Sequence, residues 1–510
     1  MALCVMFNNN LKEEMFSEEI NVETRKIIKE TCEACRLDRG TSRLVLLDEL
    51  NSLEHTFIKK EHGIFKTKHD KLFDFLAYYF GQKMIQCIIR NAHSVFIMQR
   101  LLLERKDYMD QFITIVPQKY HQMYMQRMID DWSIGKVKCV FRNINLKIQE
   151  FRHKFLCYLK KCKKSLQRQL ALKIDVNTKD TALILCSLYA DIPFIHWCIN
   201  HGVCVNLCNC RGASPLYAAT INGHKEIVKL LLDNKADINK CKDNGVSPLF
   251  AVCQNNHIEI VKILLDNKAD INKCKDDGVS PFFIACHNNH IEIVKILLDN
   301  KANINKCTDT GVSPLYIACR NNHIETVKIL LDNKADINKC DANGASPLHF
   351  ACRNNHIEIV KILLDNKADI DKSTDNEGVS PLHVACHNNH IETVKVLLDH
   401  KADINKCFAN GVSPLYIACH NNHIETVKLL LDNNADINKC TDDGESPLFV
   451  ACAENHIEIV KVLLDNNANI NKCTNNGISP KQIASDKGYN GILAVINTNI
   501  QKEEVIYQRK

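Results

Sequence analysis

A Ser-Pro pair recurs at a nearly constant step along the last two thirds of this 510-residue chain. Successive prolines lie 33 residues apart, with a single step of 34, at Pro215, Pro248, Pro281, Pro314, Pro347, Pro381, Pro414, Pro447 and Pro480. The extra residue of the longer step lies near Asn376 and Glu377, just before Gly378, where the tip of a hairpin can absorb an insertion. Self-similarity at this spacing predicts a stack of repeated units in place of one compact core.

The unit at residues 244–274 begins with a turn and the start of a helix. Asn244-Gly245 supplies the positive φ that a tight turn needs, which predicts a β-hairpin finger. Ser247 then occupies an N-cap position, and Pro248 follows at the first helical position, where a missing N–H costs nothing. We therefore expect the first helix of each unit, helix one, to begin at the Ser-Pro pair.

Two helices complete the unit. Asn255-Asn256 ends helix one, because asparagine tolerates the left-handed conformation found at helix ends. Apolar residues between positions 258 and 265 recur at steps of three and four, which predicts a longer second helix, helix two, that ends at Asp266-Asn267. Neither helix is long enough to be stable alone in water, so each pair must pack against its neighbours in a solenoid.

These features resemble the ankyrin repeat family. That family's signature is a Gly, Thr-Pro-Leu-His, two small residues, Gly-His and Leu-Leu, and one unit matches it at Gly344, Ser346-Pro347-Leu348-His349, Ala351-Cys352, Asn355-His356 and Leu363-Leu364. Ser, Cys and Asn replace the family's Thr, second small residue and Gly, and each keeps the physical role. The resemblance implies an all-α ankyrin-repeat solenoid of helix-turn-helix units with β-hairpin fingers, with about ten repeats over residues 174–500 and a charged tail at 501–510. It also implies that the array binds other proteins.

The residue just after the helix-one cysteine varies from unit to unit while the framework around it does not. We call this series the stripe: Gln254, His287, Arg320, Arg353, His387, His420 and Ala453. The exposed side of helix one and the finger tips usually contact partners in the ankyrin family, so we expect the stripe to bind a partner protein; the alternative is a solvated polar face. The finger tips add an acidic edge of further candidate binding residues, which are also ordinary turn formers: Asp243, Asp276, Asp277, Asp309, Asp442 and Asp443.

Two other series are interpreted as structural. An aromatic residue or histidine follows the apolar residue after the proline of helix one, at Tyr217, Phe250, Phe283, Tyr316, His349, His383, Tyr416 and Phe449. A second histidine precedes helix two, where the resemblance implies that its imidazole ties down the backbone, at His257, His290, His323, His356, His390, His423 and His456.

The 26 cysteines mostly follow the repeat. One series lies inside helix one as a small apolar residue, and the other starts each finger, as at Cys253 and Cys274. Members of a series are separated by the repeat rise of roughly 10 Å, beyond the ~7 Å Cα limit for a disulfide. No paired CxxC has the spacing of a zinc module, and the lone CxxC at Cys32-Cys35 is interpreted as a buried helix face. We expect no metal, no cofactor and no catalytic residues.

Residues 1–173 carry no repeat and are expected to form a helical N-terminal domain, with helices at Glu23–Cys35 and Lys71–Ile89. The strings at 30–35 and 68–81 resemble the region that follows the nucleotide-binding module in STAND-type NTPases with ankyrin C-termini. That resemblance implies a helical arm, a winged-helix-like connector and an NTPase module in the full-length gene product. No Gly-rich loop ending in Gly-Lys-Ser or Gly-Lys-Thr occurs in this chain, so ATP hydrolysis is not carried over, and a truncated paralogue or a partial gene model are both open.

Charge and hydropathy exclude some classes of function. A net charge of +5 over 510 residues gives no nucleic-acid-sized basic face. The start of the chain lacks a secretory signal, and no apolar stretch approaches the roughly 20 residues that span a bilayer. We therefore expect a cytoplasmic protein-binding scaffold or adaptor, or, as the alternative, the regulatory sensor portion of a STAND-type NTPase. One basic cluster, interpreted as solvating a connecting helix, comprises Lys160, Lys161, Lys163, Lys164, Arg168 and Lys173.

Overall fold

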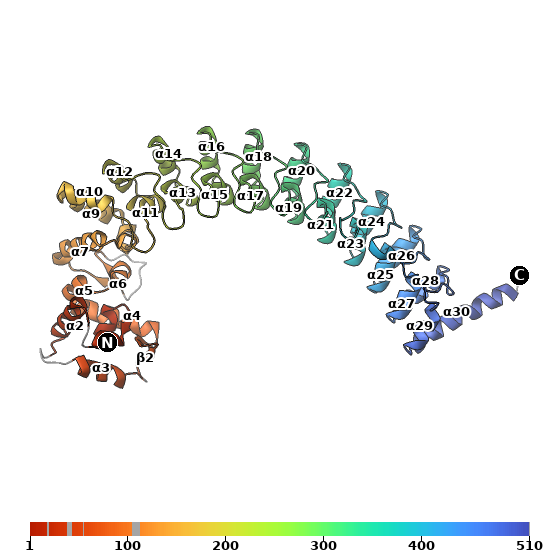
Figure 1. Cartoon of the computed structure of the whole chain (residues 1–510), viewed down its shortest axis with the longest axis horizontal. Coiled ribbons are helices and arrows are strands. Elements are labelled where there is room, and N and C mark those ends of the chain that lie inside the picture. Colours follow the sequence, from red (N-terminus) through yellow and green to blue (C-terminus); the bar gives the residue numbers. More distant parts are fainter. Residues whose placement is uncertain (18–19, 38–42, 55, 105–112, 509–510) are drawn as a thin grey trace. The chain divides into compact units, whose positions relative to one another are not determined.

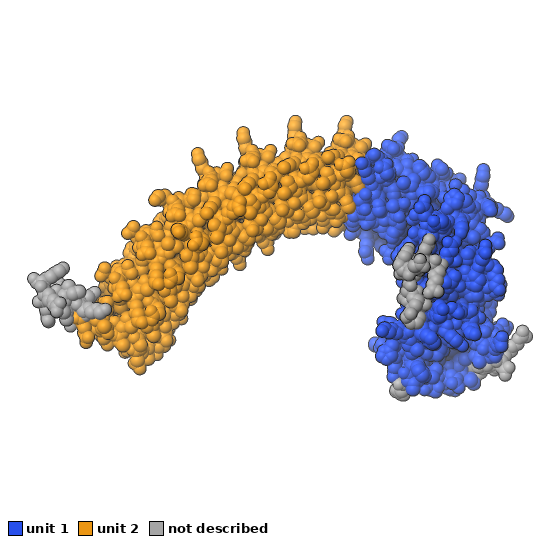
Figure 2. Space-filling model, turned by 180° about the vertical axis from the view of Figure 1, so that it is seen from behind, with its two compact units in different colours: residues 1–243 blue, residues 244–510 orange. Residues whose placement is uncertain are grey.

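The computed structural model describes residues 1–17, 20–37, 43–54, 56–104 and 113–508. These divide into two compact units, Met1–Asp243 and Asn244–Lys510 (Figure 2). The division falls among the repeats, whereas the sequence predicted a domain boundary at residue 173, and that boundary stays a prediction.

Unit 1 begins with helices arranged around a small antiparallel sheet of strand order β1-β3-β2. Its elements are α1 (Ala2–Met6), β1 (Leu11–Lys12), the 3-10 helix η1 (Glu13–Phe16), α2 (Val22–Ala34), α3 (Arg43–Ser52), β2 (Ile58–Glu61) and β3 (Ile64–Thr67). Helix α2 confirms the helix predicted near residues 23–35. The β2–β3 hairpin corrects the expectation of a purely helical domain: His62 and Gly63 both adopt positive φ, which suits a two-residue hairpin turn, and Ile58 and Phe65 are fully buried.

The next part of unit 1 is helical. It contains α4 (Asp70–Lys83), α5 (Ile85–Asn91), α6 (Ser94–Arg100), α7 (His121–Ser133), α8 (Val137–Phe141), α9 (Gln149–Lys161) and α10 (Lys164–Ala171), with η2 (Gln118–Tyr120), η3 (Ile144–Lys147) and a short parallel pair, β4 (Leu101–Leu102) and β5 (Thr114–Ile115). The single helix predicted at 71–89 is two helices, because Met84 leaves the helical conformation with φ −129° and ψ 29°. This break buries both Met84 and Ile85.

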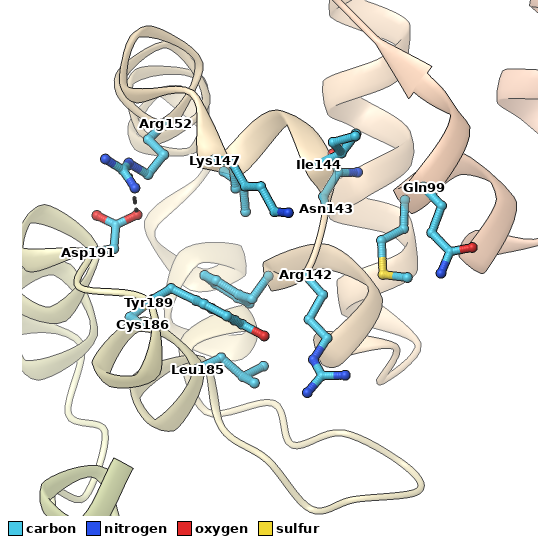
Figure 3. A pocket seen from close by; sticks show the side chains of 13 residues that line it. Gln99, Arg142, Asn143, Ile144, Lys147, Arg152, Leu185, Cys186, Tyr189 and Asp191 are labelled. Carbon is cyan, nitrogen blue, oxygen red and sulfur yellow. Dashed lines mark ion pairs between the residues drawn. The ribbon is translucent and has the colours of Figure 1, made fainter. Parts of the chain in front are cut away.

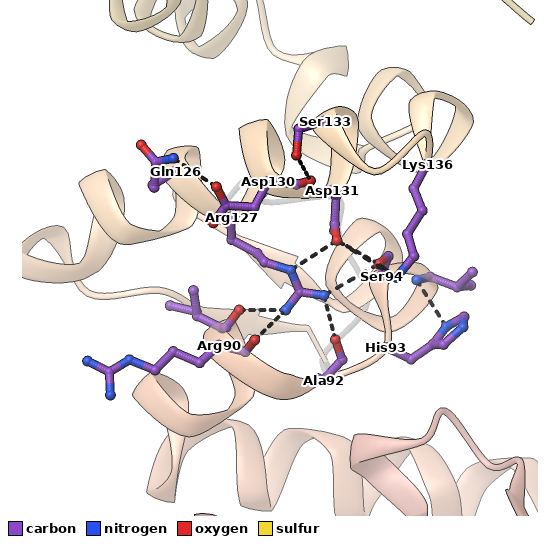
Figure 4. Close-up of polar contacts among 12 residues, drawn as sticks. Arg90, Ala92, His93, Ser94, Gln126, Arg127, Asp130, Asp131, Ser133 and Lys136 are labelled. Atoms are coloured by element: carbon purple, nitrogen blue, oxygen red, sulfur yellow. Dashed lines mark hydrogen bonds and ion pairs between the residues drawn. The ribbon is translucent and has the colours of Figure 1, made fainter. Parts of the chain in front are cut away.

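Arg127 of α7 lies almost buried among the backbone carbonyls at the end of α5 (Figure 4). Its guanidinium donates to the carbonyls of Ile89 at 2.8 Å and Ala92 at 2.9 Å, and to Oδ1 of Asp131 at 3.1 Å. Asp131 also accepts a hydrogen bond from Ser94 Oγ at 2.9 Å. Because the last carbonyls of a helix have no partner within it, this side chain joins α5 and α7.

Aromatic side chains connect these helices to the first helix pair of the repeats, α11 (Ala182–Leu188) and α12 (Ile192–Asn200). The ring centroids of Trp132 and Trp197 lie 5.7 Å apart, and those of Phe141 and Phe194 lie 5.6 Å apart. Trp132 is fully buried. The beginning of the array is therefore covered by aromatic packing, which contributes more per contact than aliphatic packing of the same area.

Regular helix pairs follow, with α13 (Pro215–Ile221) and α14 (Lys225–Asp233) in unit 1. In unit 2, helix one of each repeat is α15 (Pro248–Gln254), α17 (Pro281–His287), α19 (Pro314–Arg320), α21 (Pro347–Arg353), α23 (Pro381–His387), α25 (Pro414–His420), α27 (Pro447–Ala453) and α29 (Pro480–Asp486). Helix two is α16 (Ile258–Asp266), α18 (Ile291–Asp299), α20 (Ile324–Asp332), α22 (Ile357–Asp365), α24 (Ile391–Asp399), α26 (Ile424–Asp432), α28 (Ile457–Asp465) and α30 (Asn490–Gln508). Within unit 2 the two sets form two rows (Figure 1), which confirms the predicted solenoid.

The fingers are hairpin turns, and no strand is assigned in those that the structure describes. In a typical finger the amide of Lys275 donates to the carbonyl of Val279 at 2.9 Å, and Gly278 adopts a φ of +79°. Neighbouring fingers are in contact: a Cβ placed on the finger glycine would come within 2.4–2.9 Å of the next finger at Gly245, Gly278, Gly311, Gly344, Gly411 and Gly444. Only glycine allows both the positive φ and this spacing.

The histidine before helix two holds consecutive repeats together, as its predicted structural role requires. In His290, His323, His356, His390, His423 and His456, Nε2 lies 2.9–3.2 Å from the carbonyl oxygen of the residue that ends helix one in the preceding repeat. A carbonyl can only accept, so Nε2 carries the proton. Each of these accepting carbonyls belongs to a member of the stripe.

Candidate functional site

The stripe residues occupy the last position of consecutive first helices. Gln254, His287, Arg320, Arg353, His387 and His420 are all exposed, and Ala453 is half-buried. Their backbone carbonyls are held by the next repeat, so the side chains project from a fixed frame. Neither Arg320 nor Arg353 forms an ion pair with a residue that the structure describes. The structure thus presents these two guanidinium groups to solvent at equivalent positions of adjacent repeats.

Aromatic side chains lie beside the arginines. The rings of Tyr316 and Phe350 have centroids 4.4 Å apart, and the Tyr316 hydroxyl donates to Oδ2 of Asp341 at 3.1 Å. Burial raises the pKa of Tyr316, and the charge of Asp341 raises it further. Tyr316 is therefore a neutral phenol at physiological pH, and its position has the structural role that the sequence predicted.

The finger-tip aspartates are exposed and also shape the fingers. Asp277 accepts from the Val279 amide at 3.2 Å and pairs with Lys275 at 2.6 Å; although burial raises the pKa of Asp277, these two contacts lower it overall. Backbone hydrogen bonds to a neighbouring finger are made by Asp243, Asp276, Asp309, Asp442 and Asp443. The role of turn former is therefore present at these positions, and a role in binding stays a prediction.

The cysteines are placed as their two series suggested. Helix-one cysteines are fully buried, and burial raises the pKa of Cys452 to about 12, so these thiols stay protonated. Finger cysteines such as Cys274 are half-buried, with Sγ 3.3 Å from the carbonyl oxygen of Asn272. All 26 cysteines are free, and no group of His, Cys, Asp or Glu suited to a metal ion occurs among the described residues.

Two features of unit 1 that the sequence singled out, the lone CxxC and the basic cluster, lie on or beside helices. Cys32 and Cys35, the lone CxxC, are half-buried at the end of α2, and burial raises the pKa of both thiols. The basic cluster lies at the end of α9 and along α10, where its side chains are exposed except for the half-buried Lys173. Among the helices that the structure describes, none has the length and apolar character to cross a lipid bilayer.

The array is interrupted at its one longer step. A Cβ on Gly378 would meet Phe408 of the next finger only at 3.7 Å, so these two fingers are less tightly packed than their neighbours. The turn that contains Glu377 is one residue longer than the others. The Gly378 amide donates to the carbonyl of Thr374, four residues earlier, whereas the equivalent Gly344 amide donates to the carbonyl of Asp341, three residues earlier. The insertion thus lengthens one finger turn.

A pocket of about 560 Å³ lies at this point, in the surface between the first helices and the fingers of unit 2, which we call the groove. Its apolar lining includes Val379, Val384, Phe408, Val412 and Ile417. Stripe residues Arg353, His387 and His420 also line it. The sequence reasoning missed this pocket, although two signals were present: the 34-residue step, and Phe408 at a finger position where other units carry Lys, Thr or Asp.

Two buried histidines near the longer finger, His349 and His383, differ in the hydrogen bonding of Nε2. In His349, Nδ1 lies 3.1 Å from the Ser346 amide and Nε2 lies 2.9 Å from the Val379 carbonyl. In His383, Nδ1 is likewise 3.1 Å from an amide, that of Ser380. Its Nε2 makes no hydrogen bond of good geometry among the described residues, although the backbone of Val412 and Lys406 lies near enough to oppose in part the effect of burial on the pKa of His383. The His383 ring instead meets the Phe408 ring edge-on, with centroids 5.0 Å apart.

Acidification is expected to destabilise unit 2 through His383. Burial lowers its pKa to about 4, whereas the unfolded residue titrates near pH ~6.5. Between these values the unfolded chain binds a proton that the folded chain does not, so stability falls as the pH drops through this window. At pH 4.5 the free energy of unfolding is therefore expected to be lower than at pH 7 by about 2 kcal/mol because of His383 alone.

Urea unfolding of the wild type and of His383→Phe at pH 7 and pH 4.5 measures this effect. Phenylalanine already occupies the equivalent positions 250, 283 and 449, so the variant should fold. The wild type should lose more stability on acidification than His383→Phe, and a His287→Gln control, altered at an exposed imidazole, should behave as the wild type. Equal acid sensitivity of the wild type and His383→Phe would contradict the assignment.

A second pocket, of about 640 Å³, lies in unit 1 between η3 and the turn that joins α11 to α12 (Figure 3). Arg152 Nε and Asp191 Oδ2 lie 3.8 Å apart beside it, and Asp191 accepts from the Phe194 amide at 3.4 Å as the N-cap of α12. Burial raises the pKa of Asp191. Arg152 and Asp191 thus link α9 to the start of α12, and we assign this pair a structural role.

Comparison with known families agrees with the repeated geometry. The family model of ankyrin repeats (3 copies) matches residues 153–242, 234–308, 300–374, 369–439 and 415–504. The chain belongs to the ankyrin repeat family. No curated protein matches it significantly.

The ankyrin matches begin before residue 174, where the array was expected to start. Asp175 after α10 accepts hydrogen bonds from the amides of Asn177 at 3.1 Å and Thr178 at 3.0 Å. Asp237 accepts from Asn239 at 3.0 Å in the same way after α14. Ile-Asp-Val-Asn at 174–177 therefore corresponds to the Ala-Asp-Ile-Asn of later ankyrin units, a signal that could have placed α9 and α10 before the first recognised repeat.

Proposed function

We propose that this ankyrin protein is a non-enzymatic cytoplasmic scaffold or adaptor that binds an acidic segment of a partner protein along the stripe of unit 2. The observation that carries the proposal is the row of exposed side chains at one position of consecutive first helices, in which Arg320 and Arg353 are cations without an ion-pair partner in the described part of the chain. Complementary charge steers association and selects among partners.

The frame beneath the stripe supports this proposal. The Arg320 carbonyl accepts from His356 Nε2 at 3.1 Å and from Asn354 Nδ2 at 3.1 Å. The Arg353 carbonyl accepts from His390 Nε2 at 3.0 Å. Because the backbone is fixed before a partner arrives, little order has to be gained on binding, and preorganisation of this kind increases affinity.

Charge reversal of the two arginines tests the stripe. In the full-length chain, Arg320→Glu with Arg353→Glu is expected to weaken binding of an acidic partner at least tenfold, because two attractive charges become repulsive. The matched control is Lys295→Glu with Lys361→Glu, which changes the net charge equally on exposed positions of α18 and α22.

The measurement is affinity capture followed by quantitative mass spectrometry, with titration of each captured protein. Proteins retained by the wild type and by the lysine control, but lost from the arginine variant, support the stripe as the binding surface. Equal capture by all three proteins would rule out the stripe.

The alternative is the regulatory sensor portion of a STAND-type signalling NTPase, with its NTPase module supplied by the full-length gene product. The observation that favours it is the order α1-β1-α2-α3-β2-β3 with the sheet order β1-β3-β2, which suits a winged-helix-like connector. Sequencing of the transcript tests it. An upstream frame that encodes a Gly-rich phosphate loop supports this alternative, and a stop codon just before Met1 contradicts it.

A further inference from the structure

We infer that the pocket at the inserted finger is a recognition site for one bulky apolar side chain, such as phenylalanine, carried by the acidic segment that the stripe binds. This inference rests on the proposed function and adds the feature by which the groove distinguishes one acidic sequence from another. Two departures from the repeat, the extra residue near Glu377 and the phenylalanine at position 408, coincide in this one pocket.

The stack itself does not require either departure. The position of Phe408 is polar in the other units from Lys242 to Thr474. Outside the inserted finger, a Cβ placed on the finger glycine would come within 2.4–2.9 Å of the next finger at Gly245, Gly278, Gly311, Gly344, Gly411 and Gly444. Here the fingers pack less closely, and the Phe408 ring covers His383 and lines the pocket. The other fingers have a polar side chain at this position, whereas Phe408 is half-buried and, beyond its contact with His383, presents apolar surface to the pocket.

The pocket has the size and lining for an apolar anchor. Its volume of about 560 Å³ lies within the roughly 300–1,000 Å³ of ordinary ligand pockets. The lining combines Val384 and Ile417 from helix one with Val379, Phe408 and Val412 from the fingers. The neutral His383 adds no charge to this wall. Buried aromatic side chains that fill such pockets are the usual anchors of protein complexes.

The polar side chains around the pocket favour an acidic neighbour to that anchor. Arg353, His387 and His420 line it, with Glu377 as the one acidic lining residue. Asn421 Nδ2 donates to His387 Nδ1 at 2.9 Å, and Asn421 Oδ1 lies 3.1 Å from His420 Nδ1. The first contact leaves Nε2 of His387 as the protonated nitrogen. The polar rim therefore offers a guanidinium and an N–H donor, which suit carboxylate acceptors.

The test uses defined probes and the full-length protein. Three fluorescein-labelled heptapeptides are titrated by fluorescence anisotropy: aspartates and glutamates around a central phenylalanine, the same peptide with a central alanine, and lysines around a phenylalanine. The wild type should bind the acidic phenylalanine peptide at least tenfold tighter than the acidic alanine peptide. The lysine peptide should not bind.

Two variants close or fill the pocket. Deletion of Glu377 restores the 33-residue step and the Asp-Asn-Gly turn found at 243–245, and Val384→Trp places a ring in the pocket. Each should reduce the affinity for the phenylalanine peptide to that for the alanine peptide. Ile284→Trp, the half-buried equivalent position in another repeat, is the matched control and should leave both affinities unchanged.

Phe408→Thr removes one wall and introduces the residue that other fingers carry, so it keeps the test decisive if the tryptophan variant does not fold. Its expected effect is the same loss of preference for phenylalanine. Equal binding of the two acidic peptides to the wild type, with both lost in the Arg320→Glu, Arg353→Glu protein, would overturn the pocket and leave the proposed function in place. Failure of the wild type to bind either acidic peptide would overturn both.

Discussion

Arg127→Ala is expected to lower the free energy of unfolding of unit 1 by about 3–5 kcal/mol, the range for breaking a buried ion pair by removing one partner. The guanidinium satisfies the carbonyls of Ile89, Arg90 and Ala92 together with the carboxylate of Asp131 (Figure 4). Alanine would leave the three carbonyls without this donor. It would also leave Asp131, which is only 5% exposed, with the Ser94 hydroxyl at 2.9 Å and the Lys136 ammonium at 4.0 Å as its remaining polar partners.

The unfolding of unit 1 has its own optical signal, because both tryptophans of the chain, Trp132 and Trp197, lie in it. Urea titration followed by tryptophan fluorescence compares the wild type, Arg127→Ala and Arg90→Ala. The Arg90 side chain is exposed and lies beside the same helix end, so Arg90→Ala should change stability by less than about 0.5 kcal/mol. Similar losses in the two variants would contradict the role given to Arg127.

Gly344→Ala is expected to cost unit 2 about 3 kcal/mol, and Gly477→Ala about 1 kcal/mol. The two glycines have nearly the same backbone, with φ of +80° and +79°. A Cβ at position 344 would lie 2.4 Å from the Asp375 amide nitrogen, whereas at position 477 it would meet nothing within 4 Å. The pair therefore separates the strain of a positive φ from the contact between neighbouring fingers.

Circular dichroism during thermal and urea unfolding gives the two stability losses, and hydrogen exchange locates them. In Gly344→Ala the amides around the fingers at 341–345 and 374–379 should lose protection, since one finger must move from the other. If both variants lose the same stability and the same protection, the fingers do not depend on close packing.

The repeat geometry could be predicted from the sequence because the local signals agree with one another. Ser247 and Pro248 start helix one where the structure has it, and Asn256 ends it in the left-handed conformation, with a φ of 59°. Helix two was likewise placed correctly at 258–266. Each signal is local and recurs from unit to unit. A helix boundary that is ambiguous in one repeat can therefore be placed from the same position in the other repeats.

The features that sequence reasoning missed depend on contacts between distant segments. The break at Met84 leaves two helices where the apolar pattern predicted one, because burial of Met84 and Ile85 outweighs helix continuity. The β2–β3 hairpin rests on a two-residue turn at His62 and Gly63, a weaker signal than Asn-Gly. The pocket needs Val384 and Phe408 to meet across two fingers, which no local pattern shows.

The hydrogen bonds between repeats have a consequence for how such an array changes over generations. At Arg320 and Arg353 the carbonyl oxygen accepts a hydrogen bond from the next repeat, while the side chain is exposed to solvent. Substitution of either side chain can therefore change what the stripe binds without removing the hydrogen bond between repeats, because that hydrogen bond uses only the backbone carbonyl. Specificity for a ligand and cohesion between repeats are thus encoded by different atoms of the same residue.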